Sequence, residues 1–113
     1  MAKRAPKGHV VVLVTCGSRR EAGKIARRVV QRRLAACVNV LEMPVLSVYR
    51  WKGKIEQARE FLLLMKTSRS RLGALRAEVQ RLHSYDVPEF IALPIASGSP
   101  AYLRWLDDSL RAR

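Results

Sequence analysis

The chain has 113 residues, of which 49% are hydrophobic and 27% are charged, and its formal net charge is +13. This length predicts one domain, the apolar share excludes a disordered chain, and no apolar run approaches the roughly 18 residues of a membrane span. The two cysteines, Cys16 and Cys37, are too few for a disulfide framework or a four-cysteine zinc site.

Residues 1–8 form a short basic segment ahead of the first predicted strand. They hold no signal-peptide core or small-residue cleavage site, so we expect a flexible basic tail and a cytoplasmic protein. The β-branched run at 9–15 is typical of a strand that is buried on both faces. No linker or internal repeat follows, so the sequence predicts a single domain at 9–113.

A helix is predicted at 19–33. Ser18 and Glu21 have the spacing of a capping box, which places the first helical residue at Arg19. Apolar residues recur at helical spacing, so one face of this helix is expected to pack on the core. The opposite face carries five basic side chains: Arg20, Lys24, Arg27, Arg28 and Arg32.

The middle third of the chain is rich in strand-forming residues. Two runs, 36–41 and 45–49, flank Pro44, which requires a bulge, a bend or an edge at that point. Gly53 is expected to take a positive φ in a hairpin turn. The run at 61–65 again has the composition of a strand buried on both faces.

The last third of the sequence predicts a helix, then a strand and then a second helix. Ser68 or Ser70 can cap the first of these helices, and Pro88 forbids its continuation. A short strand is expected at 89–94. Pro100 suits the first position of a terminal helix.

The predicted element order is β-α-β-β-α-β followed by a helix. This order indicates an α+β fold, a ferredoxin-like βαββαβ sandwich with a long hairpin between its second and third strands and an extra C-terminal helix. The hairpin at 34–67 is longer than one small sheet needs, so part of it is expected to pair with another chain.

Catalytic motifs are absent from the sequence. It has no phosphate-binding glycine loop, no GxSxG and no HExxH. Catalysis needs a nucleophile within reach of a base, and no such pair is visible. We therefore predict that the protein is not an enzyme.

His83 ends the second predicted helix and precedes Tyr85, Asp86 and Glu89 in a turn. An imidazole, two carboxylates and a phenol brought together could hold a divalent metal ion. The competing interpretation is a histidine at a helix end that hydrogen-bonds a carbonyl group. Spacing alone favours this second interpretation.

Cys16 is the other candidate metal ligand. It follows the first strand and lies beside the predicted helix N-terminus, where a thiolate is stabilised and would suit a soft ion such as Cu(I). Cys37 lies within a strand and is interpreted as a small buried hydrophobe.

The basic face of the first helix suits a phosphate backbone, so a nucleic-acid or polyanion partner is the alternative interpretation. A solvated, arginine-rich surface explains the same residues. Because no strand carries an aromatic run of the kind that stacks on RNA bases, the sequence favours the solvated surface.

Several segments support a family resemblance. They are 34–39 (LAACVN), 47–56 (SVYRWKGKIE), 64–67 (LMKT), 83–89 (HSYDVPE), 91–95 (IALPI) and 102–106 (YLRWL). Together they resemble the CutA family of divalent-cation tolerance proteins, in the same order and from about residue 10 to residue 110.

This resemblance implies a ferredoxin-like subunit in a tight homotrimer, similar in architecture to the PII signal-transduction proteins, with the long hairpin extending sheets across subunits. It implies a link to copper and other divalent cations, no established reaction and no obligatory cofactor. It also implies clefts near the subunit interfaces, lined here by Tyr49, Trp51, Glu60, Lys66, Tyr85, Asp86 and Glu89.

The resemblance also implies that His83 is the best positional match to a histidine implicated in metal binding in that family. The sequence departs from the family pattern at Ser84 and Asp86, which replace the usual proline and glutamate, and at Val14, which aligns with a cysteine of some members. The sequence thus predicts a CutA-like homotrimer that binds copper, another divalent cation or a small ligand and responds to metal ions. No membrane partner is expected, and nucleic acid is the less favoured partner.

Overall fold

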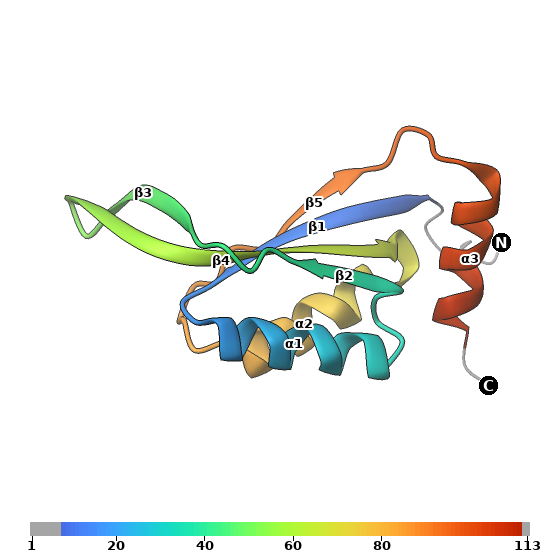
Figure 1. Ribbon diagram of the computed structural model, residues 1–113, viewed down its shortest axis with the longest axis horizontal. Helices are drawn as coiled ribbons and strands as arrows, with labels where there is room; N and C mark the ends of the chain where they lie inside the picture. Colours follow the sequence, from blue (N-terminus) through green and yellow to red (C-terminus); the bar gives the residue numbers. More distant parts are fainter. Residues whose placement is uncertain (1–7, 112–113) are drawn as a thin grey trace, which may run out of the picture.

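The computed structural model describes residues 8–111 (Figure 1), so the predicted basic tail lies, apart from Gly8, outside the described residues. Within them the chain forms one five-stranded sheet and three α-helices. The elements are β1 (His9–Cys16), α1 (Arg19–Gln31), β2 (Cys37–Val40), β3 (Val45–Trp51), β4 (Lys54–Ser68), a 3-10 turn (Arg69–Arg71), α2 (Leu72–Leu82), β5 (Ile91–Pro94) and α3 (Pro100–Leu110).

The sheet order is β2-β4-β1-β5, and all of its pairs are antiparallel. Helices α1 and α2 lie together below the sheet, and α3 stands at its end (Figure 1). The prediction of an α+β, ferredoxin-like βαββαβ fold with an additional C-terminal helix is therefore confirmed.

The long hairpin has two parts. The first half of β4 pairs with β3, from Val45 opposite Glu60 to Trp51 opposite Lys54, and this ribbon projects beyond the rest of the sheet (Figure 1). The second half of β4 pairs with β1 and β2. Residues 41–44, which include Pro44, interrupt the strand between β2 and β3 as predicted.

The hairpin closes with a two-residue turn. Lys52 and Gly53 both have positive φ, +50° and +80°, which are the signs that a type I′ turn requires. The turn predicted at Gly53 is therefore confirmed.

Ser18 caps the first helix as predicted, but the Glu21 side chain does not return a hydrogen bond to the cap residue as it would in a full capping box. Ser18 Oγ accepts a hydrogen bond from the backbone N–H of Glu21 at 3.1 Å. The Glu21 carboxylate turns away from the cap and accepts hydrogen bonds from the backbone N–H and the hydroxyl of Ser84. Glu21 thereby ties the N-terminus of α1 to the turn that follows α2.

Three predicted boundaries shift. Helix α1 ends at Gln31 rather than at residue 33, because Arg33 has a φ of +56°. Helix α2 begins at Leu72 without a side-chain cap, since the hydroxyls of Ser68 and Ser70 bond each other at 2.8 Å. The last strand is shorter than predicted and begins at Ile91.

The core lies between the sheet and the two helices. Val10, Val12 and Val14 of β1 are at most 2% exposed, whereas Val11 and Leu13 between them are only partly buried. The prediction of strands buried on both faces is therefore wrong for the single chain, because α1 and α2 cover only one face.

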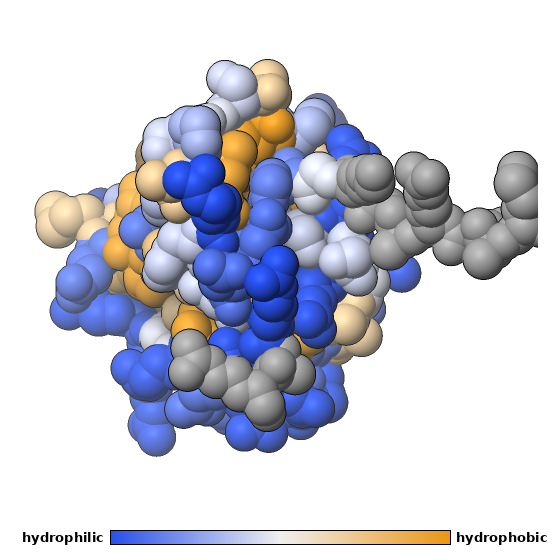
Figure 2. Space-filling model, turned by 90° about the vertical axis from the view of Figure 1, so that its right-hand side faces the viewer, coloured by the Kyte–Doolittle hydropathy of each residue, from blue (hydrophilic) through white to orange (hydrophobic). Residues whose placement is uncertain are grey.

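The other face, here called the uncovered sheet face, is largely apolar, although Lys66 also lies on it, opposite Val11. Its register places six aliphatic side chains together: Val11, Leu13, Leu62, Leu64, Ile91 and Leu93. In the end-on view, which looks onto the α3 end of the molecule, most of the hydrophobic surface lies in the upper half and at the left edge, and the lower half, on the side of α1 and α2, is mostly hydrophilic (Figure 2).

A buried carboxylate joins the two helices. Glu78 of α2 is 7% exposed and forms ion pairs with three arginines: Arg28 at 3.5 Å, Arg32 at 3.2 Å and Arg81 at 2.8 Å. The hydrogen bond from Arg81 is the main cause that lowers the pKa of Glu78 to about 2, against the opposing effect of burial.

Replacing Glu78 with glutamine is expected to lower the free energy of unfolding at pH 7 by about 1–2 kcal/mol, because three charged hydrogen-bond donors lose their anion. A carboxyl whose pKa is lowered on folding stabilises the fold above its ordinary pKa, 4.5, and loses that effect as the pH falls toward 2. Urea unfolding at several pH values should show the difference between wild type and variant shrinking over that range. Glu42→Gln, an exposed position, is the control, and a difference that stays constant down to pH 2 would contradict the assignment.

Candidate functional site

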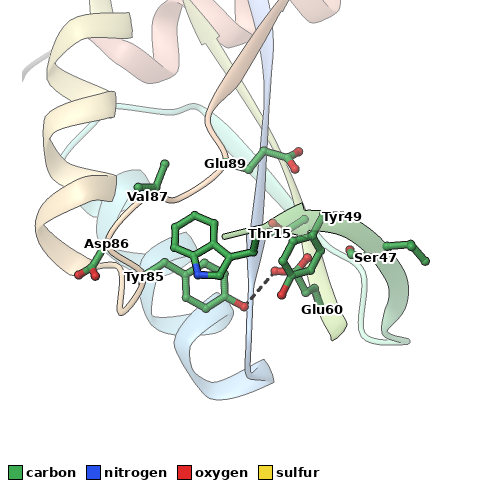
Figure 3. A pocket seen from close by; sticks show the side chains of 10 residues that line it. Thr15, Ser47, Tyr49, Glu60, Tyr85, Asp86, Val87 and Glu89 are labelled. Atoms are coloured by element: carbon green, nitrogen blue, oxygen red, sulfur yellow. Dashed lines mark hydrogen bonds between the residues drawn. The ribbon is translucent and has the colours of Figure 1, made fainter. Parts of the chain in front are cut away.

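A pocket of about 570 Å³ lies between the β3–β4 ribbon and the segment that follows α2 (Figure 3). Its lining residues come from three parts of the chain: Thr15 at the end of β1; Ser47, Val48, Tyr49, Trp51 and Glu60 of the ribbon; and Tyr85, Asp86, Val87 and Glu89 of the segment after α2.

Strand geometry positions the ribbon side of the pocket. Ser47, Tyr49 and Trp51 alternate along β3 and so share one face. Glu60 stands where β4 leaves β1 and begins to pair with β3, opposite Val45. This junction holds the Glu60 carboxylate at the base of the ribbon, where it is only 8% exposed.

One local hydrogen bond and one to the ribbon hold the opposite wall. Helix α2 ends at Leu82, and the His83 ring then accepts a hydrogen bond at Nδ1 from the backbone N–H of Tyr85 at 3.1 Å. The Tyr85 hydroxyl in turn donates to Glu60 Oε2 at 2.9 Å (Figure 3). The turn therefore directs Tyr85 across the pocket to the ribbon.

Two groups of the pocket have shifted pKa values. Burial, the hydrogen bond to Glu60 and the charge of Glu60 all raise the pKa of Tyr85, so its hydroxyl stays protonated and donates at neutral pH. Burial and the charge of Glu60 also raise the pKa of Glu89. Burial is the larger cause of both shifts, and the charge of Glu60 adds to each of them.

The structure brings together six of the seven residues that the sequence indicates for the cleft: Tyr49, Trp51, Glu60, Tyr85, Asp86 and Glu89. Lys66 lies elsewhere, six residues farther along β4 and opposite Val11, roughly 20 Å from Glu60. Ser47 also lines the pocket, and its position two residues before Tyr49 is a signal that strand alternation could have supplied. No sequence pattern marks Thr15.

His83 has a structural role in this arrangement. Its side chain is fully buried, and Nε2 lies 2.8 Å from the carbonyl oxygen of Thr15. Since a carbonyl only accepts, Nε2 donates and Nδ1 is the acceptor for Tyr85, which uses both ring nitrogens. A metal ion would have to displace one of these hydrogen bonds.

Cys16 is fully buried, and its pKa shifts in the direction opposite to the one expected at a helix N-terminus. Burial raises the pKa of the thiol to about 12, with smaller contributions from the charges of Glu21 and Glu60. A protonated thiol is a poor ligand for a soft metal ion. Cys37 lies within a strand as predicted, but it is only half-buried in β2 and not fully buried as its interpretation as a small buried hydrophobe implied.

The predicted basic face of α1 divides into two groups. Arg28 and Arg32 hold the Glu78 carboxylate. Arg20, Lys24 and Arg27 are exposed. Part of this face therefore belongs to the contact between α1 and α2.

No group of three or more histidine, cysteine, aspartate or glutamate side chains in residues 8–111 is placed to hold a metal ion. In the same part of the chain, no helix has the length and apolar character needed to cross a bilayer.

Comparisons with known proteins give a consistent result. A family model described as CutA1 divalent ion tolerance protein matches residues 10–109. The divalent-cation tolerance protein CutA of Thermus thermophilus is 46% identical over 99 residues, which are 88% of this chain and 95% of the relative.

The CutA homolog of Xenopus laevis is 48% identical over 95 residues, 84% of this chain, but the chain spans only 62% of that relative's length. The structure of the periplasmic divalent cation tolerance protein CutA from Archaeoglobus fulgidus superposes with a TM-score of 0.88 at 39% identity. That match covers 91% of this chain and 99% of the other.

Proposed function

Because the chain belongs to the CutA1 divalent ion tolerance family, we propose that it acts as a homotrimer that binds a cation in the pocket between the β3–β4 ribbon and the segment after α2. The supporting observation is the Glu60 carboxylate, which is shielded from solvent at the base of that pocket. Binding of divalent cations there would link the protein to metal tolerance without a catalytic step.

The homotrimer rests on the uncovered sheet face and on the ribbon. Ile91 and Leu93 on that face are each 47% exposed, and the ribbon carries exposed apolar side chains such as Val48 and Ile55. A second and a third copy would cover these surfaces and extend the sheet edge. The pocket opens beside the ribbon, so assembly would place it near a subunit boundary.

The donor set favours oxygen-preferring cations. Glu60 and Glu89 supply carboxylate oxygens, which suit hard divalent ions. Copper would draw on His83 or Cys16 only if the hydrogen bonds of the first or the burial of the second were given up. We therefore propose that cation binding uses the two glutamates, in a cytoplasmic protein with no enzymatic activity.

Titration calorimetry with Mn²⁺ and with Cu²⁺ tests this function. Glu60→Gln is expected to weaken Mn²⁺ binding by about tenfold, while Asp108→Asn, an exposed carboxylate on α3 that does not line the pocket, leaves it unchanged. Unchanged Mn²⁺ affinity in Glu60→Gln would remove the pocket from the proposal. Light scattering that shows a stable monomer at micromolar concentration would remove the trimer.

A further inference from the structure

The pocket is acidic in a strongly basic protein. Three of the chain's nine acidic residues line it: Glu60, Asp86 and Glu89. None of the lysines and arginines between residues 8 and 111 is part of the lining. An anionic ligand would therefore meet carboxylates here, and a cationic ligand would meet no like charge in the lining.

The Glu60 carboxylate has no counter-ion among residues 8–111. Glu60 is 8% exposed, and its carboxylate accepts a hydrogen bond from the neutral hydroxyl of Tyr85. Among the described residues no basic side chain forms an ion pair with Glu60 or Glu89. Shielded carboxylates are normally paired, so this one leaves room for a cation from outside the chain.

Aromatic and aliphatic surface faces the same space. Tyr49, Trp51 and Val87 line the pocket and are 43%, 47% and 71% exposed. Asp86 lies at the far end, with its carboxylate directed away from Glu60, so Glu60 and Glu89 are the acidic groups beside the ring of Tyr49 (Figure 3). Exposed aromatic rings beside carboxylates attract organic cations through their ring faces.

A divalent metal ion would bind the carboxylates of the pocket but would make no use of its aromatic and aliphatic wall. Calcium takes about six to eight oxygen ligands, and no three His, Cys, Asp or Glu side chains within residues 8–111 are placed to hold a metal ion, so water would have to complete the shell of an ion bound to the two glutamates. An alkylammonium ion needs one or two carboxylates for its charge and an apolar wall for its carbon chain. The lining provides both.

We propose that this pocket binds a small primary alkylammonium ion, with the ammonium group against Glu60 and Glu89 and the carbon chain along Tyr49, Trp51 and Val87. The Ser47 side of β3 borders the same space. This inference rests on the proposed function, namely that the pocket is a cation site, and it specifies the chemical class of the cation.

The test compares n-butylammonium with 1-butanol, which has the same carbon chain and no charge. The chain has two tryptophans, so the Trp105→Phe protein leaves Trp51 as the single fluorescent reporter in the pocket. Butylammonium is expected to change the Trp51 emission with at least tenfold higher affinity than butanol. Glu60→Gln should lower that affinity at least tenfold, and Asp108→Asn, on the exposed side of α3 and outside the pocket lining, should leave it unchanged.

Equal affinity for butanol and butylammonium would overturn the inference, because the pocket would then be merely apolar. If Mn²⁺ binds in a Glu60-dependent way and butylammonium neither binds nor competes, the alkylammonium inference fails and the proposed function stands. If neither cation binds and Glu60→Gln changes nothing, both fail. Glu60-dependent competition between butylammonium and Mn²⁺ supports both.

Discussion

Replacing His83 with alanine is expected to lower the free energy of unfolding by about 2–5 kcal/mol. The imidazole is fully buried, donates to the Thr15 carbonyl at 2.8 Å and accepts from the Tyr85 N–H at 3.1 Å. Alanine would leave both groups without a partner and would open a cavity beside the Tyr85 ring, whose centroid lies 4.7 Å from that of His83.

Urea unfolding at a fixed protomer concentration measures this loss, since the stability of an oligomer depends on concentration. His9→Ala is the matched control. His9 is half-buried and bonds the partly exposed Asp107 at 2.8 Å, so its replacement is expected to cost less than about 1 kcal/mol. Equal losses for the two variants would contradict the structural role of His83.

A second substitution at His83 distinguishes its two interpretations, as a metal ligand and as a histidine that hydrogen-bonds within the protein. Glutamine keeps a donor and an acceptor, and copper titration of His83→Gln is expected to give the wild-type affinity because the ring nitrogens are already used within the protein. A loss of copper affinity in a folded His83→Gln protein would show that the histidine leaves these hydrogen bonds to bind metal.

The sequence predicts well what depends on neighbours in the chain. The capping serine at 18, the turn at Lys52 and Gly53 and the interruption at Pro44 are all local, and each occurs where it was expected. The alternation of Tyr49 and Trp51 is local as well, and it places both rings in the pocket.

Contacts between residues that are far apart in the sequence cannot be predicted from these local patterns. The partner of His83 Nε2 is Thr15, 68 residues earlier in the chain. Glu21 fits a local capping box, yet its carboxylate holds Ser84. Cys16 follows the rule for a reactive thiol in sequence, but burial in the core reverses the direction of its pKa shift.

The uncovered sheet face gives the second large prediction. Leu93→Glu is expected to convert the proposed trimer into monomers at micromolar concentration, because assembly would bury an unpaired carboxylate in an apolar interface. Leu93 lies on the short strand β5 and is 47% exposed, so the monomer itself should fold normally, as circular dichroism would show.

Val30→Glu is the control, since Val30 is 40% exposed on α1, the helix layer away from the uncovered sheet face. Light scattering should give the mass of a trimer for wild type and Val30→Glu and that of a monomer for Leu93→Glu. A trimeric Leu93→Glu protein would place the interface elsewhere.

The charge of the chain also predicts how assembly of the proposed trimer depends on salt concentration. Each subunit carries a formal +13, so the proposed assembly must form against repulsion between three basic chains. Raising the ionic strength from about 0.1 M to 1 M shortens the screening length from about 10 Å to 3 Å and should strengthen the wild-type trimer. It should not restore Leu93→Glu, because screening reaches exposed charges far more than a carboxylate buried in an apolar contact. Apolar burial on the sheet face, rather than charge pairing, would then be what holds the subunits together.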